Sequence, residues 1–176
     1  MFEKTLLSNL IYNEDFTRKT LPFIKPDFFR NRDEVTLFNI INAFVVKYNN
    51  LPTKEAIEIE LSNNKTLTED EYKNTKSLLN SLQHEEVEQQ WLLDTTEKFC
   101  KDRAVYNAVL QGIKIIDGKD KKHTPEAIPS ILSEALGVSF DRHIGHDYLA
   151  QTDERFDYYH RTEERLKFDL SYFNRI

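Results

Sequence analysis

Two stretches of this 176-residue chain carry residue types that bind phosphate or metal ions. The first runs from Gly112 to Asp120 and places two glycines ahead of Lys119, as in a phosphate-binding loop. Five residues separate these glycines, whereas the Walker pattern has four, and Asp120 stands where a Ser or Thr hydroxyl would hold Mg²⁺. A carboxylate there repels phosphate. We therefore interpret Asp117-Gly118 as the end of a helix, with the glycine in the left-handed conformation.

The second stretch gathers four possible metal ligands within seven positions: Asp141, His143, His146 and Asp147. The two histidines are three residues apart, a spacing that suits a metal site only in a helix, and Gly145 between them disfavours a helix. We interpret these side chains as polar linker residues and helix caps. A small zinc hydrolase built on the two histidines is an alternative, which stoichiometric zinc would support.

No other segment of the sequence shows a motif that would position a catalytic nucleophile or a general base. His84-Glu85-Glu86 lacks the second histidine of a metalloprotease helix, so we interpret it as a capping segment. Cys100 has Lys98 and Lys101 nearby, and cations lower a thiol pKa, but no histidine falls at helical reach. We expect a buried structural cysteine. On these residues alone, the chain is an interaction module with no catalytic residue, metal site or cofactor site.

The composition favours helices and excludes several classes of protein. Four Gly and five Pro are too few for a turn-rich β architecture. The net charge of −6 makes the chain a poor general binder of phosphate backbones. The single cysteine suits a reducing cytosol, and no apolar run approaches the roughly 20 residues that span a bilayer. We expect a cytoplasmic, all-α protein.

Helical periodicity and capping signals locate the elements. The first dozen residues form one amphipathic helix, and a short element covers residues 16–21. Asn31, Thr53 and Thr68 each precede a further helix as its N-cap, and Glu34 and Glu71 complete two capping boxes. The longest pattern runs from about residue 86 to Asp117-Gly118. A shorter helix follows, with Pro129 in its first turn and Gly137 as its stop.

The last two helices, joined by a charged loop, predict a helical hairpin that extends past the five shorter helices. An apolar stripe on such an arm needs a partner, and we expect a second copy of the arm to provide it. The residues predicted for self-association are Tyr106, Leu110, Ile113, Ile131, Leu132 and Leu136. The loop tip carries Lys119, Lys121 and Lys122, which are either solvated or contact an acidic partner or DNA.

The end of the chain predicts a linker helix. Leu149, Phe156 and Tyr159 share one face of a highly charged segment, at offsets of seven and three. A helix of this length is marginal in water by itself. We therefore expect these three side chains to dock on another surface.

Taken in order, these features resemble the N-terminal region of DnaB-type hexameric replicative DNA helicases, most closely those of T-even-like bacteriophages. The similarity covers nearly the whole chain and is densest in four places: Leu6-Leu7-Ser8-Asn9-Leu10-Ile11; Asn49-Asn50-Leu51-Pro52-Thr53; Trp91-Leu92 through Thr96-Glu97-Lys98 to Arg103-Ala104; and Ala127-Ile128-Pro129 through Ala135-Leu136 to Ser139-Phe140-Asp141 and Gly145-His146-Asp147.

The resemblance implies a helical head (1–98), a helical hairpin (99–138) and a linker with its helix (139–176). In that family, hairpins from two subunits pair and three pairs form a collar on a six-membered ring. The linker helix docks on the neighbouring subunit's RecA-like ATPase domain, and the collar engages primase and, in some systems, a loader.

The chain stops before the family's Walker A region would be expected. ATP or GTP, Mg²⁺ and 5′–3′ helicase activity are therefore implied only for a RecA-like domain that the given sequence lacks, and DNA contact only through it. If the protein is phage-encoded, it would act in the cytoplasm of the bacterial host. An all-helical phage helicase loader or adaptor is the alternative, although a loader usually needs a basic face with aromatic side chains to grip single-stranded DNA.

Overall fold

The computed structural model describes residues 2–84 and 86–140. The chain divides at Phe140 into two units, and all the described residues belong to the first. The described residues contain helices and no strand, so the predicted all-α fold is confirmed. The helices are α1 (Phe2–Tyr12), α2 (Glu14–Thr20), α3 (Arg32–Tyr48), α4 (Lys54–Asn63), α5 (Glu69–Ser81), α6 (Gln89–Ile116) and α7 (Ile128–Leu136), with 3₁₀ turns η1 (Leu21–Phe23), η2 (Pro26–Phe28) and η3 (Pro125–Ala127).

The helices begin where the sequence places side-chain acceptors. At α5, the Thr68 hydroxyl accepts from the Glu71 N–H at 3.3 Å, and the Glu71 carboxylate accepts from the Thr68 N–H at 2.9 Å. Asn31 and Glu34 form a second capping box at α3, and the Thr53 hydroxyl accepts from the first turn of α4. These three predicted caps are confirmed. They satisfy N–H groups that a helix leaves without backbone partners.

The head, which we define as α1 to α5 with the first half of α6, is built around α1. Every residue from Leu6 to Ile11 in α1 is buried, so this helix is enclosed on all sides. Its buried polar members have partners: the Asn9 amide donates to the Thr5 carbonyl at 2.9 Å, and the Ser8 hydroxyl donates to the distant Gln83 carbonyl. Helices α2 and α3 pack directly on α1, and the Phe2 ring lies 5.6 Å from that of Phe99 in α6. The first half of α6 therefore belongs to the core of the head.

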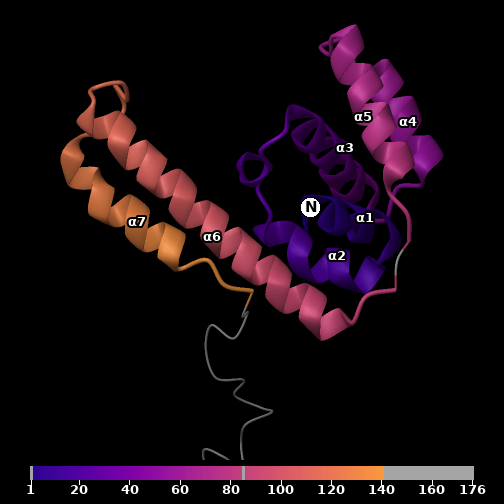
Figure 1. Cartoon of the computed structure of the whole chain (residues 1–176), viewed down its shortest axis with the longest axis horizontal. Helices are drawn as coiled ribbons and strands as arrows, with labels where there is room; N and C mark the ends of the chain where they lie inside the picture. The colour runs from indigo at the N-terminus through magenta and orange to yellow at the C-terminus, as the bar shows by residue number, and fades with distance from the viewer. Residues whose placement is uncertain (1, 85, 141–176) are drawn as a thin grey trace, which may run out of the picture. The chain divides into compact units, whose positions relative to one another are not determined.

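Helices α4 and α5 form a pair that packs on α3 (Figure 1). Arg32 at the start of α3 forms an ion pair with Glu71 of α5, with 2.6 Å between Nε and Oε1. Lys76 of α5 pairs with Glu58 of α4. Between these exposed charges, Ile57, Leu61 and Leu79 are buried. The apolar side chains rather than the surface ion pairs hold the pair in place, because exposed pairs contribute little.

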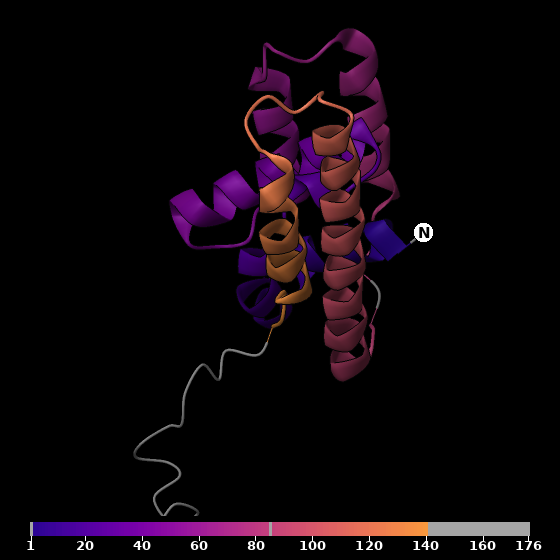
Figure 2. The same ribbon diagram turned by 90° about the vertical axis from the view of Figure 1, so that its left-hand side faces the viewer.

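Helix α6 continues without a break from the head into the hairpin, across residues 98 and 99. Its 28 residues end at Ile116, and Gly118 follows with a φ of +69°, as the helix-end interpretation predicted. Helix α7 then packs antiparallel along the second half of α6, with Pro129 in its first turn and Gly137 after its last residue (Figures 1 and 2). Beyond α7, the Phe140 ring stacks on Phe23 of the head at 4.9 Å.

Candidate self-association site

The second half of α6 has two faces of different character. One face is lined by small residues, Ala104, Ala108 and Gly112, followed by Ile115, and all four are buried. They recur at intervals of four, four and three, so they follow one side of the helix. A Cβ atom added to Gly112 would lie 3.6 Å from the Ile128 side chain. The small side chains let α7 approach closely, so α7 occupies this face.

The opposite face carries large apolar side chains that no other described element covers. We call it the hairpin seam: Tyr106 (51% exposed), Val109 (47%), Leu110 (39%), Ile113 (49%) and Ile116 (72%). Tyr106, Val109, Ile113 and Ile116 are spaced by three, four and three residues, the spacing of a coiled-coil contact. Clustered exposed apolar residues of this kind mark a protein interaction surface.

Side-chain hydrogen bonds hold the base of the hairpin to the head. Arg103 is buried, and its Nε donates to the Phe28 carbonyl of η2 at 2.6 Å. One turn further along α6, the Asn107 amide donates to the Asp27 carbonyl at 2.9 Å. These bonds fix the position of α6 against η2 at the base of the hairpin.

The residues that the sequence predicted for self-association occupy different positions. Tyr106, Leu110 and Ile113 lie in the hairpin seam, and Leu136 of α7 is 70% exposed. Ile131 and Leu132 are half-buried and pack against the hydrophobic core. Sequence reasoning missed Val109 and Ile116. Counting the three-four-three spacing along the second half of α6 would have found both.

A comparison with curated proteins found a relative of the chain. The DnaB-like replicative helicase of Enterobacteria phage T4 is 30% identical over 179 residues, which cover 97% of this chain. The resemblance to DnaB-type replicative helicases is confirmed. The chain spans 38% of the length of that DnaB-like helicase. No family model matches the chain.

The tip of the hairpin, between α6 and η3, is a hydrogen-bonded turn. The Asp120 carboxylate accepts from the Lys122 N–H at 2.8 Å and contacts the His123 ring at 3.0 Å. The hydrogen bond from the Lys122 N–H is the largest cause that lowers the pKa of Asp120, and the hydrogen bond with the His123 side chain is the second. Lys119 pairs with Asp117 at 2.9 Å, while Lys121 and Lys122 are exposed. Three exposed lysines, one of them paired with Asp117, therefore lie at the end of the hairpin that points away from the head (Figure 1).

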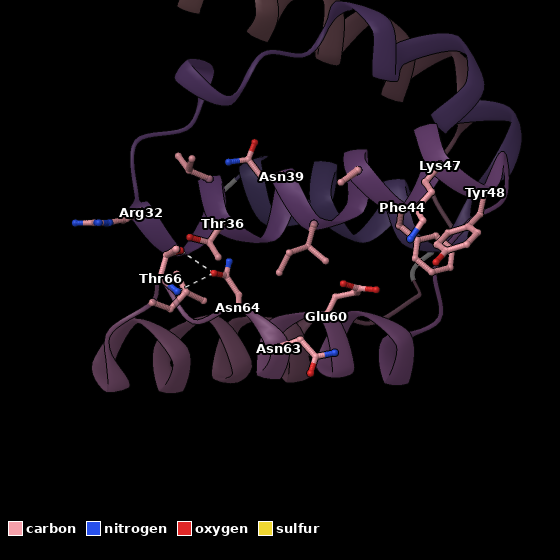
Figure 3. Close-up of a pocket in the computed structure, with 14 residues that line it drawn as sticks. Arg32, Thr36, Asn39, Phe44, Lys47, Tyr48, Glu60, Asn63, Asn64 and Thr66 are labelled. Carbon is pink, nitrogen blue, oxygen red and sulfur yellow. Dashed lines mark hydrogen bonds between the residues drawn. The ribbon is translucent and has the colours of Figure 1, made fainter.

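A groove of about 620 Å³ lies between α3 and the end of α4 (Figure 3). Val35, Ile40 and Phe44 contribute apolar surface, and Asn39 and Asn63 contribute amides. The Asn64 carboxamide accepts from the Thr66 N–H and hydroxyl and so shapes the turn after α4. Neither histidine nor cysteine lines the groove, and its one carboxylate is Glu60. Its lining therefore mixes apolar side chains with amides, hydroxyls and opposite charges.

The remaining chemical candidates are placed as follows. Cys100 is completely buried, as expected, and burial raises the pKa of its thiol to about 12, with a further contribution from Glu97. Within residues 2–84 and 86–140, no three histidine, cysteine or acidic side chains are grouped to hold a metal ion. No helix in the same residues is long and apolar enough to cross a membrane. The candidates Asp141, His143, His146 and Asp147, and the docking face Leu149, Phe156 and Tyr159, lie outside the described residues.

Proposed function

We propose that this chain is a non-catalytic assembly domain of a replicative ring helicase. Two copies pair through the hairpin seam, and three such pairs form a collar on the ring. The observation that carries the proposal is the uncovered three-four-three stripe on α6, on the side of the hairpin opposite α7. The relative's description as a DnaB-like replicative helicase supports the same role.

The composition of the seam suggests how strongly two copies would associate. Full burial of a large apolar side chain stabilises by roughly 1.5–3 kcal/mol, so completing the burial of a half-exposed one gives about 1 kcal/mol. Association itself costs roughly 4–15 kcal/mol. Five seam residues from each copy give a gain of the same order as this cost. We therefore expect a weak isolated dimer, which becomes stable when several pairs are joined in one ring.

The other roles follow from this assembly. The head (1–98) and hairpin (99–138) form the collar and engage primase, and a loader is a further partner. The linker (139–176) leads to the ATPase domain and docks through Leu149, Phe156 and Tyr159. The whole helicase would unwind duplex DNA by NTP hydrolysis with Mg²⁺, in the cytoplasm of the host.

The test is the double variant Leu110→Glu/Ile113→Glu. Both side chains are partly exposed, so the head should keep its helical circular dichroism spectrum. Burying four charges in one dimer interface should weaken self-association at least a hundredfold, measured by sedimentation velocity over a concentration series.

Lys114→Glu is the matched control. It also changes the charge by −2, on the same helix, but at an exposed position off the seam. This variant should associate as the wild type does. If the double variant also sediments like the wild type, the seam is not the interface. Co-purification of the wild type, and not the double variant, with the cognate primase would show that the primase needs the paired form.

A further inference from the structure

Arg103 lies where the head, the hairpin and the seam meet. Its side chain is buried, with 9% of the residue exposed, and its Nε donates to the Phe28 carbonyl at 2.6 Å. Its guanidinium carbon lies 4.9 Å from the centre of the Tyr106 ring. No ion pair between Arg103 and a carboxylate is found in the described residues. A carbonyl and an aromatic face therefore stabilise this buried cation.

The turn that Arg103 holds is a small, separate element of the head. The Phe28 N–H donates to the Lys25 carbonyl at 3.1 Å, and the Phe29 N–H donates to the Pro26 carbonyl at 3.2 Å. The side chains of Phe28 and Phe29 are buried in the core. The Arg103 and Asn107 side chains hold the carbonyls of two consecutive residues of this turn from one side of α6.

Tyr106 connects this arrangement to the seam. One face of its ring receives the Arg103 guanidinium, yet half of the residue remains exposed on the proposed contact surface. A cation over an aromatic ring is stabilised little where water reaches the pair and more strongly where water is excluded. Covering Tyr106 would thus strengthen its contact with Arg103.

We propose that Arg103 and Tyr106 couple pairing at the hairpin seam to the η2 turn of the head. When a second copy covers Tyr106, the ring is fixed and water is excluded from it, and the hydrogen bond from the buried Arg103 to the Phe28 carbonyl strengthens. Pairing therefore stiffens the turn. By thermodynamic reciprocity, a partner that displaces η2 loosens the pairing. This inference rests on the proposed self-association.

The experiment measures amide hydrogen exchange of Phe28 and Phe29 in the whole chain, below and above the concentration at which it self-associates. We expect exchange at both amides to slow several-fold on association. The Ile24 N–H is the internal control, because it donates to the Leu21 carbonyl at 3.3 Å in η1, a similar turn that lacks these α6 contacts. Exchange at Ile24 should not change.

Two substitutions at Tyr106 separate coupling from packing. Tyr106→Phe keeps the ring face and should slow exchange at Phe28 and Phe29 as the wild type does. Tyr106→Leu keeps an apolar seam residue but removes the ring. Because Tyr106 belongs to the seam, Tyr106→Leu should weaken association, so it is compared with the wild type at concentrations that give the same associated fraction. There, exchange at the two amides should no longer differ between the free and the associated chain.

The outcomes distinguish this inference from the proposed function. Association without slower exchange at Phe28 and Phe29, or a Tyr106→Leu variant that matches the wild type, overturns the coupling and leaves the assembly role intact. A chain that stays monomeric, or a Leu110→Glu/Ile113→Glu variant that still pairs, overturns both.

Discussion

The surroundings of Cys100 in the fold differ from its surroundings in the sequence. Cationic residues precede and follow it along the chain, but Lys101 turns outward and pairs with Glu97 at 2.5 Å. The thiol faces the core, where burial raises its pKa to about 12 from an ordinary value of 9.0. A thiolate there would lack solvation, so Cys100 packs as a small apolar residue.

We predict that Cys100 resists alkylation in the folded protein. At pH 8, a thiol whose pKa is about three units higher carries roughly a thousandfold less thiolate, so iodoacetamide should react only as the chain unfolds. Mass spectrometry across a urea series measures this, with the denatured chain as control. Because the pKa is raised in the folded state, stability is unaffected below about pH 9 and falls as the pH rises towards 12. Rapid labelling without denaturant would show that the site is open.

At the scale of single residues, the sequence identified the helix caps and the end of α6 because each depends on local chemistry. The capping box depends only on contacts between Thr68 and Glu71, which are three residues apart. The end of α6 depends on the left-handed backbone conformation of Gly118. The role of Arg103 could not be predicted in this way. Its partner Phe28 lies 75 positions away in sequence, and a carbonyl acceptor leaves no mark on residue type.

At the scale of one helix, α6 separates small and large apolar residues onto opposite sides. Periodicity predicted an apolar arm but could not show which side α7 would occupy. The space that Gly112 leaves for Ile128 decides this, because large side chains there would keep α7 away. Ile131 and Leu132, predicted for self-association, are half-buried and pack against the core.

Two glycine substitutions in this hairpin should have opposite effects. Gly112→Ala adds a methyl group at ordinary contact distance from Ile128 and removes a flexible residue from the middle of the helix, so it should stabilise by about 0.5–1 kcal/mol. Gly118→Ala meets no neighbour, but its φ of +69° is unfavourable for alanine, so it should destabilise by about 1 kcal/mol.

Urea unfolding of the two variants beside the wild type provides the measurement. Each serves as the other's control, because both replace glycine by alanine in the same hairpin. Destabilisation by Gly112→Ala would mean that α7 lies closer to α6 than described.

At the scale of the whole molecule, helix content, helix order and the hairpin could be predicted, because apolar spacing and caps are local signals. The groove between α3 and α4 could not. Its lining joins residues from Arg32 to Leu67 in two helices and a turn, and its shape depends on how the α4–α5 pair packs on α3.

The assembly should tolerate salt, because the seam is apolar while the chain carries a net charge of −6. Salt screens the repulsion between like-charged copies and leaves apolar burial intact. Sedimentation at 50 mM and 500 mM NaCl, about a tenfold range that shortens the screening length about threefold, should give an equal or tighter dissociation constant at the higher value. Tenfold weaker association in high salt would indicate an ionic interface and contradict the seam.

Because α6 is one continuous helix, a rotation at its base in the head would be transmitted to the tip of the hairpin. Its 28 residues measure about 42 Å, of which about 20 Å lie beyond Arg103. A tilt of roughly 5° at that residue would move the tip by about 1.7 Å, on the same rise per residue. In the proposed six-membered ring, six such small displacements would add up around the circumference. The contact between Arg103 and the η2 turn would then influence the width of the opening in that proposed ring.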